Sequence, residues 1–250
     1  FINIINNIYL NKFTIYLKIN KSIIYFMNIK NNKLTNNKNL VSKICAFICI
    51  ICASSAIVAM VMLLINSKTA REITSFSLYS SFLIIFYIIN SIYHFFPFHY
   101  KAKKVFFILS HAFFIMMIWG VYIPPCLISL EAGWGWSFFG IITGLCILGI
   151  TLRSVFGYRW RDWTETIYYF LLNWVWLIAI SKISSAVGDY GAILYLTGFL
   201  LLNISMVFYR LAMYETNKRY TLFLPMFYSL LIISNICHAI FMFKYVANVF

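Results

Sequence analysis

Charged residues, and acids above all, are scarce in this 250-residue sequence. It contains only six Asp and Glu residues and four histidines, and charged residues make up 10% of the chain while hydrophobic residues make up 63%. A soluble domain of this length carries far more charge on its surface. The composition therefore excludes an ordinary soluble protein and indicates one that is embedded in a membrane.

The few carboxylates are also poorly placed for buried chemistry. Each lies in a loop or at the end of an apolar run: Glu72, Glu131, Asp162, Glu165, Asp189 and Glu215. We therefore expect no carboxylate inside the membrane to pair with a buried histidine, which argues against a proton relay built from acids and histidines. The sequence also lacks a G-x-S-x-G elbow, so a catalytic triad of the soluble type has no support.

The cysteines indicate neither a disulfide framework nor a strong metal site. All six fall in or at the ends of apolar runs, and Cys45, Cys49 and Cys52 follow one stripe of a helix. No histidine or carboxylate accompanies them at ligand spacing, so we interpret them as small buried residues.

Seven long apolar runs follow one another from about residue 43 onward. Each has about 18 to 26 residues, enough for a helix rising ~1.5 Å per residue to cross a ~30 Å hydrocarbon core. Because lipid offers the backbone no hydrogen-bond partners, these runs should be helical. We predict an all-α polytopic membrane protein with seven transmembrane helices. The predicted spans are Lys43–Ile65, Ile73–Phe96, Val105–Leu127, Trp134–Leu152, Thr166–Ile183, Gly191–Met213 and Thr221–Val246.

The basic residues predict how the helices are oriented. The net charge of +14 lies in short segments between apolar runs, which does not resemble the basic face of a nucleic-acid-binding domain. Sixteen of the 20 Lys and Arg residues lie before or at the start of the first span, or at or after the ends of the second, fourth and sixth. The positive-inside rule then places the N-terminus in the cytoplasm and the C-terminus outside. We expect a multi-pass protein of the cell (inner or plasma) membrane whose partner is the lipid bilayer, with no nucleic acid.

Residues 1–40 form a separate lead segment rich in Ile, Asn and Lys, and residues 41–250 form the predicted transmembrane domain. We expect the lead segment to be cytoplasmic and not a cleaved signal peptide. Because the segment contains Met27, we hypothesise that translation starts there and that residues 1–26 are not translated natively. Sequencing the native N-terminus tests this, and a peptide starting upstream of Met27 would contradict it.

One stretch around the second and third spans holds three of the four histidines. An ionisable group at membrane depth marks a candidate functional site. Helix rise places His94 and His111 in one layer near the cytoplasmic side, whereas His238 falls in the opposite leaflet and His99 in a loop. Two histidines are one ligand short of an open catalytic zinc site. The alternative is that both are hydrogen-bonded interior residues of a helix bundle.

Some non-ionisable residues predict local packing. Pro124 and Pro125 should kink or end the third span. Glycines in the fourth span should permit close helix approach. These glycines are Gly135, Gly140, Gly144 and Gly149.

Four segments occur in the order and at the intervals of a known family: Asn90–His94, Leu109–His111, Ile118–Pro124 and Gly133–Trp136. The first resembles an S-x-x-x-H motif, the next two resemble a D-H…I-A-G-T-Y-T-P helix, and the last is similar to the start of a fourth span. These are motifs of the hemolysin III family, a branch of the seven-helix superfamily that includes the adiponectin and progestin receptors. The resemblance covers about 200 residues, from near Ser42 to the end.

The resemblance implies a zinc ion bound near the cytoplasmic side by the S-x-x-x-H histidine and two histidines of span seven, with an Asp of span three acting on a zinc-bound water. His94 matches the first ligand and His238 a later histidine of span seven. Leu224 and Tyr228 stand at the other two ligand positions, and Ser110 stands at the Asp. Leu has no lone pair, a neutral phenol is a poor ligand, and hydrolysis without the acid lacks a general base. We therefore expect a degenerate metal site without zinc or another cofactor.

The family name implies membrane lysis or pore formation, and this cytolytic toxin activity is the function that we expect from the resemblance. One alternative is a zinc-dependent lipid amide or ester hydrolase related to ceramidases, with His94, Ser110 and His111 as candidate catalytic residues. The other is a non-catalytic, receptor-like membrane module that binds a lipid ligand. The missing ligands and the missing acid favour a protein that is not an enzyme.

Overall fold

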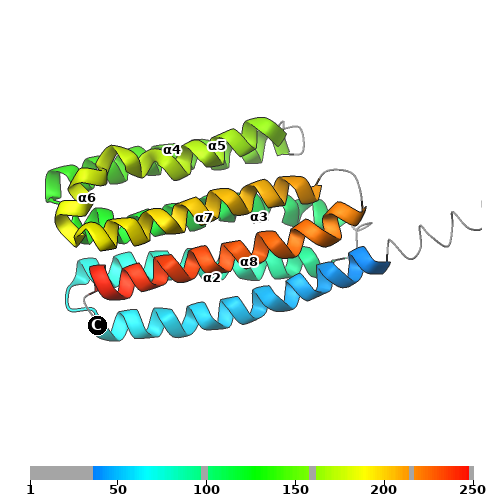
Figure 1. Ribbon diagram of the computed structural model, residues 1–250, viewed down its shortest axis with the longest axis horizontal. Helices are drawn as coiled ribbons and strands as arrows, with labels where there is room; N and C mark the ends of the chain where they lie inside the picture. Colours follow the sequence, from blue (N-terminus) through cyan, green and yellow to red (C-terminus); the bar gives the residue numbers. More distant parts are fainter. Residues whose placement is uncertain (1–35, 97–100, 158–161, 214–216, 248–250) are drawn as a thin grey trace, which may run out of the picture. The chain divides into compact units, whose positions relative to one another are not determined.

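The computed structural model describes residues 36–96, 101–157, 162–213 and 217–247 (Figure 1). The predicted lead segment 1–40, with the possible start at Met27, lies outside these residues except for 36–40, and so does His99. Contacts divide the chain into two units, and the second, Val41–Phe250, contains the features described below.

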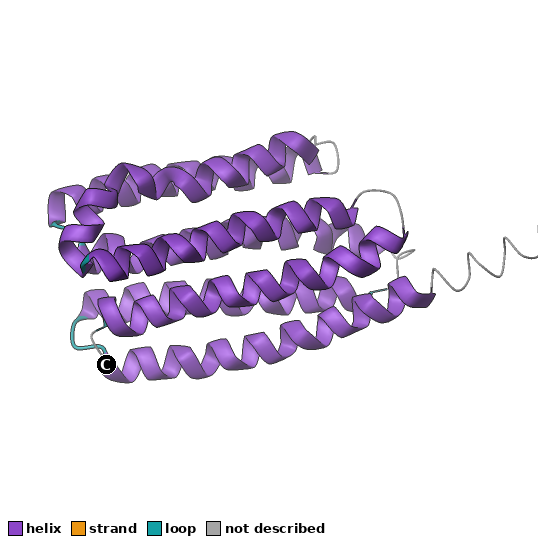
Figure 2. Cartoon of the chain, viewed as in Figure 1, coloured by secondary structure: helices purple, strands orange, loops and turns teal. Residues whose placement is uncertain are grey.

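The described residues are helical and contain no strand (Figure 2). Within them, seven helices are long and apolar enough to cross a membrane, which confirms the predicted all-α fold and its seven spans. The spans are Asn36–Asn66, Ala70–Phe95, Ala102–Ser129, Gly133–Phe156, Thr164–Val187, Asp189–Met213 and Arg219–Val246. The largest difference from the prediction is at the first span, which begins at Asn36 where the sequence suggested Lys43.

After the unlabelled first helix, the elements are α2 (Ala70–Phe95), α3 (Lys101–Pro124), the π-helical η1 (Pro125–Ser129), α4 (Ala132–Phe156), α5 (Asp162–Trp174), the 3₁₀-helical η3 (Val175–Ala179), α6 (Ile180–Val187), α7 (Asp189–Met213), α8 (Asn217–Phe241) and the π-helical η4 (Met242–Val246). The fifth span therefore consists of α5, η3 and α6 where one continuous helix was predicted. The change of helix type follows Asn173, a fully buried residue whose amide donates to Asn203 of α7 at 3.1 Å.

The helix ends follow local sequence signals. Thr69 caps α2 by accepting the N–H of Glu72 at 3.2 Å, and the Glu72 carboxylate accepts the N–H of Lys68, the residue before the cap, at 2.7 Å. Gly157 and Gly188, at φ +49° and +78°, follow α4 and α6, where L side chains are strained. As predicted, the α-helix of the third span ends at the two prolines.

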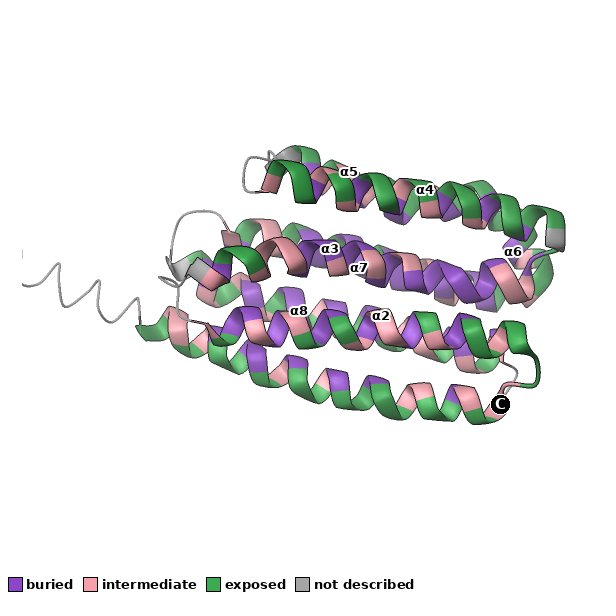
Figure 3. Ribbon diagram, turned by 180° about the vertical axis from the view of Figure 1, so that it is seen from behind, coloured by how far each residue is buried: buried purple, intermediate pink, exposed green. Residues whose placement is uncertain are grey.

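The α3 helix lies at the centre of the bundle. Within its span, 61% of the most apolar window is buried, compared with 22% for the first helix. It contacts α2 on one side and α4 on the other, while α7 packs along α8 and also contacts α5 (Figure 1). Figure 3 shows buried residues running along α3 and α7 and many exposed residues on the outer helices. A side chain on α3 can therefore meet groups from several helices.

Large apolar side chains cover the outer helices. Ile51, Ile65, Val155 and Ile178 are each more than two-thirds exposed. In water such a surface would be an aggregation liability, whereas in a bilayer it is the face that contacts acyl chains.

The glycines of α4 fall into two groups. A Cβ on Gly135 would overlap the carbonyl oxygen of Cys126, and one on Gly149 would overlap the ring of Tyr168. A Cβ on Gly140 or Gly144 would meet nothing within 4 Å. The prediction of close helix approach is thus confirmed at the first two positions and wrong at the other two, which face away from neighbouring helices.

Candidate functional site

His94 lies in the last turn of α2, is 2% exposed, and has a hydroxyl at each ring nitrogen. The Tyr228 hydroxyl of α8 is 2.6 Å from Nε2, and the Ser42 hydroxyl of the first helix is 3.2 Å from Nδ1. Tyr228 donates its own proton to Asn90 Oδ1 at 3.2 Å, so it accepts the proton of Nε2. His94 is therefore a hydrogen-bonded junction between three helices.

The groups around His94 do not fit the zinc ion that the hemolysin III resemblance implies. The structure brings Tyr228 to His94, as the positional comparison placed it, but its donor is a neutral phenol. Leu224, at the other ligand position, is fully buried and has no donor atom. In the part of the chain that the structure describes, no three His, Cys, Asp or Glu residues gather closely enough to hold a metal ion. Structural zinc needs four such ligands and catalytic zinc at least three.

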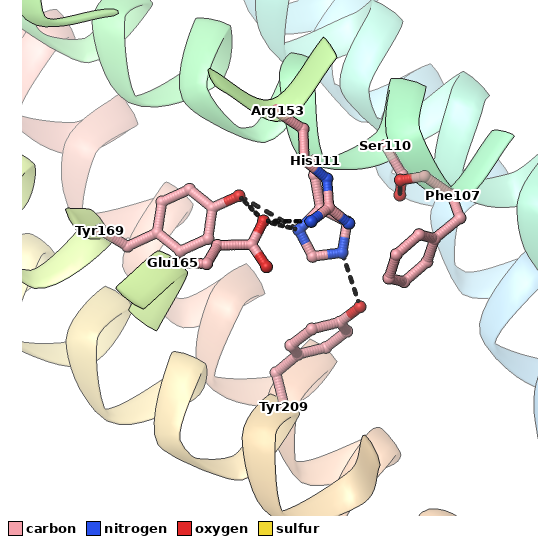
Figure 4. A network of polar contacts seen from close by, with 7 residues as sticks. All are labelled: Phe107, Ser110, His111, Arg153, Glu165, Tyr169 and Tyr209. Carbon is pink, nitrogen blue, oxygen red and sulfur yellow. Dashed lines mark hydrogen bonds and ion pairs between the residues drawn. The ribbon is translucent and has the colours of Figure 1, made fainter. Parts of the chain in front are cut away.

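His111 of α3 lies in a second, charged network (Figure 4). Its Nδ1 is 2.7 Å from Glu165 Oε1, and the Tyr209 hydroxyl of α7 lies 2.9 Å from its Nε2. Tyr169 also donates to Glu165 Oε1, at 3.0 Å, and Arg153 Nη1 is 3.1 Å from the same oxygen. One carboxylate oxygen thus receives three donors, and the network connects α3, α4, α5 and α7.

The expectation that no carboxylate could pair with a buried histidine is therefore wrong. Glu165 does lie near the beginning of its span, as predicted, but its helical face turns it inward, and it is only 5% exposed. Arg153, which was assigned to a loop, occupies the last turn of α4 and is 2% exposed. A buried carboxylate and a buried guanidinium are each costly alone and become tolerable as a hydrogen-bonded pair.

Ser110 does not join either histidine directly. Its hydroxyl donates to the carbonyl oxygen of Phe107 at 2.9 Å. Ser110, His111 and Asn90 nevertheless line one small cavity of about 20 Å³, completed by Phe86, Phe114, Met206, Tyr209 and Phe227. Such a volume holds about one water molecule, whereas small-molecule sites are on the order of 300–1,000 Å³.

His238 is separate from both networks. It is fully buried on α8, against Gly198 and the rings of Tyr195 and Phe199 of α7. Neither of its ring nitrogens has a hydrogen-bond partner among the described residues. The structure thus gathers His94, Ser110 and His111 near one end of the bundle and leaves His238 outside that group.

The sequence interpretation missed four members of the charged network: Arg153, Glu165, Tyr169 and Tyr209. Two signals were available. Glu165 and Tyr169 are four residues apart and share one helical face. Arg153 follows the apolar run of the fourth span with no intervening turn residue, so continuing the helix by one turn would have placed it at the margin of the membrane.

Comparisons with known proteins identify the family of the chain. A model of the family described as Haemolysin-III related matches residues 34–238. Hemolysin-3 of Bacillus cereus is 29% identical over 157 residues, which are 62% of this chain and 71% of that protein. Hemolysin-3 homolog of Bacillus subtilis (strain 168) is 25% identical over 154 residues, again 62% and 71%. No solved structure matches the chain significantly. Because the family match covers most of the sequence, from before the first span to residue 238 of the seventh, the chain belongs to the Haemolysin-III related family.

Proposed function

We propose that this protein is a cytolytic membrane protein that permeabilises lipid bilayers from within the membrane. The observation that carries the proposal is the family match over residues 34–238, together with relatives that are named hemolysins. The exposed apolar faces of the outer helices support it, because they require the protein to reside in the bilayer on which it acts. A second part of the proposal is that the protein works without a zinc centre.

The hydrogen bonds of His94 support this second part. The phenol of Tyr228 lies against Nε2, and the hydroxyl of Ser42, which donates to the His94 carbonyl oxygen at 2.9 Å, lies 3.2 Å from Nδ1, whereas zinc needs anionic or imidazole partners. The chemistry of these neighbours favours a structural role in which His94 ties α2 to α8 and to the first helix.

A leakage assay tests the proposed function. The purified full chain is reconstituted into liposomes loaded with a self-quenched dye, and an unrelated polytopic membrane protein at the same protein-to-lipid ratio is the control. We expect dye release that rises with protein density, that is unchanged by a zinc chelator, and that stays within about twofold in His94→Gln. Release equal to that of the control would contradict lysis and would favour the lipid-binding alternative. Loss of release with chelator would contradict zinc independence.

A second candidate function is lipid amide or ester hydrolysis, favoured by the contact between Glu165 and His111. A carboxylate at Nδ1 is the arrangement by which an acid orients a histidine as general base. In this candidate, Ser110 and His94 complete a rearranged site. The cavity beside His111 is far smaller than an acyl substrate, so the helices would have to separate. Turnover of a ceramide-like substrate that is lost in both Ser110→Ala and His94→Ala, with the unfolding midpoints of both variants unchanged, would support hydrolysis, and no turnover by the wild-type chain would exclude it.

We further propose residence in the cell (inner or plasma) membrane with the N-terminus in the cytoplasm. The excess of basic residues before the first span and after the second, fourth and sixth supports this orientation. Lys68 and Lys104 are both exposed and lie at opposite ends of the bundle. A membrane-impermeant thiol reagent should label Lys68→Cys in intact cells and Lys104→Cys only after permeabilisation. The reverse pattern would contradict the orientation.

A further inference from the structure

A cavity of about 210 Å³ lies at the end of the bundle opposite His94. The η1–α4 junction forms one wall and α6 forms the other. Its lining mixes charged, polar and apolar side chains: Ser129, Leu130, Glu131, Trp134, Lys182, Ser185 and Ala186. This volume is about ten times that of the one-water cavity beside His111, so it has room for a small polar group.

Close backbone packing fixes the wall that carries Glu131 and Trp134. A Cβ on Gly135 would overlap the carbonyl oxygen of Cys126, and the Gly135 N–H donates to the carbonyl oxygen of Glu131 at 2.7 Å. The Leu130 N–H donates to the carbonyl oxygen of Pro125 at 3.0 Å. The α6 helix contacts η1 directly. The cavity is therefore formed before any ligand arrives, which lowers the entropic cost of binding.

Charges of opposite sign face this cavity without neutralising each other. Lys182 comes from α6 and Glu131 from the start of α4, and within the described residues neither takes part in an ion pair. The Glu131 carboxylate does not cap α4. The Lys182 ammonium lies 5.9 Å from the ring centre of Trp134, so Trp134 holds it beside the cavity. A ligand with one anionic and one cationic group would satisfy both side chains.

The depth of the cavity identifies the layer from which a ligand would come. Glu131 falls between the spans Ala102–Ser129 and Gly133–Phe156, and Lys182 lies near the end of the span Thr164–Val187. Trp134 and Trp136 are 46% and 56% exposed at the same level, as expected for aromatic residues at a membrane interface. The cavity therefore opens where lipid headgroups reside.

We propose that this cavity binds the headgroup of a zwitterionic phospholipid of the phosphatidylethanolamine type. The phosphate pairs with the Lys182 ammonium, the lipid ammonium pairs with the Glu131 carboxylate, and Ser129 and Ser185 provide hydroxyls at the rim. A phosphoethanolamine group has the size that the cavity accommodates. An anionic headgroup would place no positive charge near Glu131 and would bind less well.

Binding of short-chain lipids to the detergent-solubilised full chain, measured by native mass spectrometry, tests the proposal. We expect dihexanoyl-phosphatidylethanolamine to bind at least fivefold more tightly than dihexanoyl-phosphatidylglycerol. Lys182→Gln should weaken binding of both lipids about tenfold, whereas Glu131→Gln should weaken only the zwitterionic lipid and remove the preference. Lys244→Gln is the matched control, because Lys244 is also exposed, follows α8 at the same end, and lies 5.8 Å from the Tyr245 ring centre.

Three results would overturn the proposal. The first is equal affinity of the wild-type chain for the two lipids. The second is Lys182→Gln binding both lipids as tightly as Lys244→Gln does. The third is binding of free phosphoethanolamine or inorganic phosphate as tightly as the lipid, which would make the cavity a site for soluble anions. Thermal unfolding of each variant separates lost binding from lost folding, since these exposed substitutions should leave the unfolding midpoint unchanged.

Discussion

The substitution Glu165→Gln should destabilise the whole helical unit, because it leaves the Arg153 guanidinium buried without its anion. Arg153 is 2% exposed, and of its three guanidinium nitrogens only Nη1 has a partner among the described residues. At the 3.1 Å between Nη1 and Oε1, and an effective dielectric constant of about 20, the pair attracts by about 5 kcal/mol. Removing one member of such a buried pair costs about 3–5 kcal/mol in the free energy of unfolding.

Thermal unfolding of the detergent-solubilised chain, followed by circular dichroism, measures this loss. At about 2–4 °C per kcal/mol, the unfolding midpoint of Glu165→Gln should fall by about 6–20 °C. The exposed Glu131→Gln is the control and should shift it by no more than about 2 °C. The double variant Glu165→Gln/Arg153→Met, which removes both charges, should recover most of the loss. A midpoint of Glu165→Gln equal to that of Glu131→Gln would refute the ionic network.

Two further predictions concern packing and hydrogen bonding, and unfolding midpoints measure both. Tyr228→Phe removes the hydroxyl that accepts from His94 Nε2 and leaves that buried donor unpaired, so it should lower the free energy of unfolding by about 1–3 kcal/mol. An unchanged unfolding midpoint would contradict the hydrogen bond. Gly135→Ala should lower the free energy of unfolding by about 1–3 kcal/mol, because its Cβ would overlap the Cys126 carbonyl oxygen. Gly140→Ala places its Cβ in open space and should leave that free energy unchanged or raise it by up to ~1 kcal/mol. Equal effects of the two substitutions would contradict the packing.

Much of the fold could be predicted from the sequence, because the thickness of a bilayer fixes the length of each apolar run. The two prolines also ended the helix of the third span where expected. The break in the fifth span could not be predicted in this way. Residues 175–179 are as apolar as their neighbours, and the 3₁₀ segment contains neither glycine nor proline. The hydrogen bond between Asn173 and Asn203, just before this segment, is a contact between helices that hydropathy does not reveal.

The candidate site could be predicted only in part. The hemolysin III resemblance implies that Tyr228 and His94 occupy ligand positions of one site, and in the structure the Tyr228 hydroxyl contacts His94 Nε2. The contact between His111 and Glu165 could not be predicted in this way, because the position of a residue along a span does not determine whether its side chain is exposed. A residue near the end of a span can face the centre of the bundle, and the rotation of its helix decides which way it points. Hydropathy measures depth along the helix axis and contains no information on that rotation.

The zinc content of the purified full chain tests most directly whether hydrogen bonds stand in place of the metal site that the hemolysin III resemblance implies. Elemental analysis of protein from zinc-supplemented cells should find well below one zinc per chain, and His94→Ala should not change that value. Tyr228→Phe keeps the aromatic ring and serves as a second variant that should also leave it unchanged. One zinc per wild-type chain that is lost on His94→Ala would contradict the degenerate site.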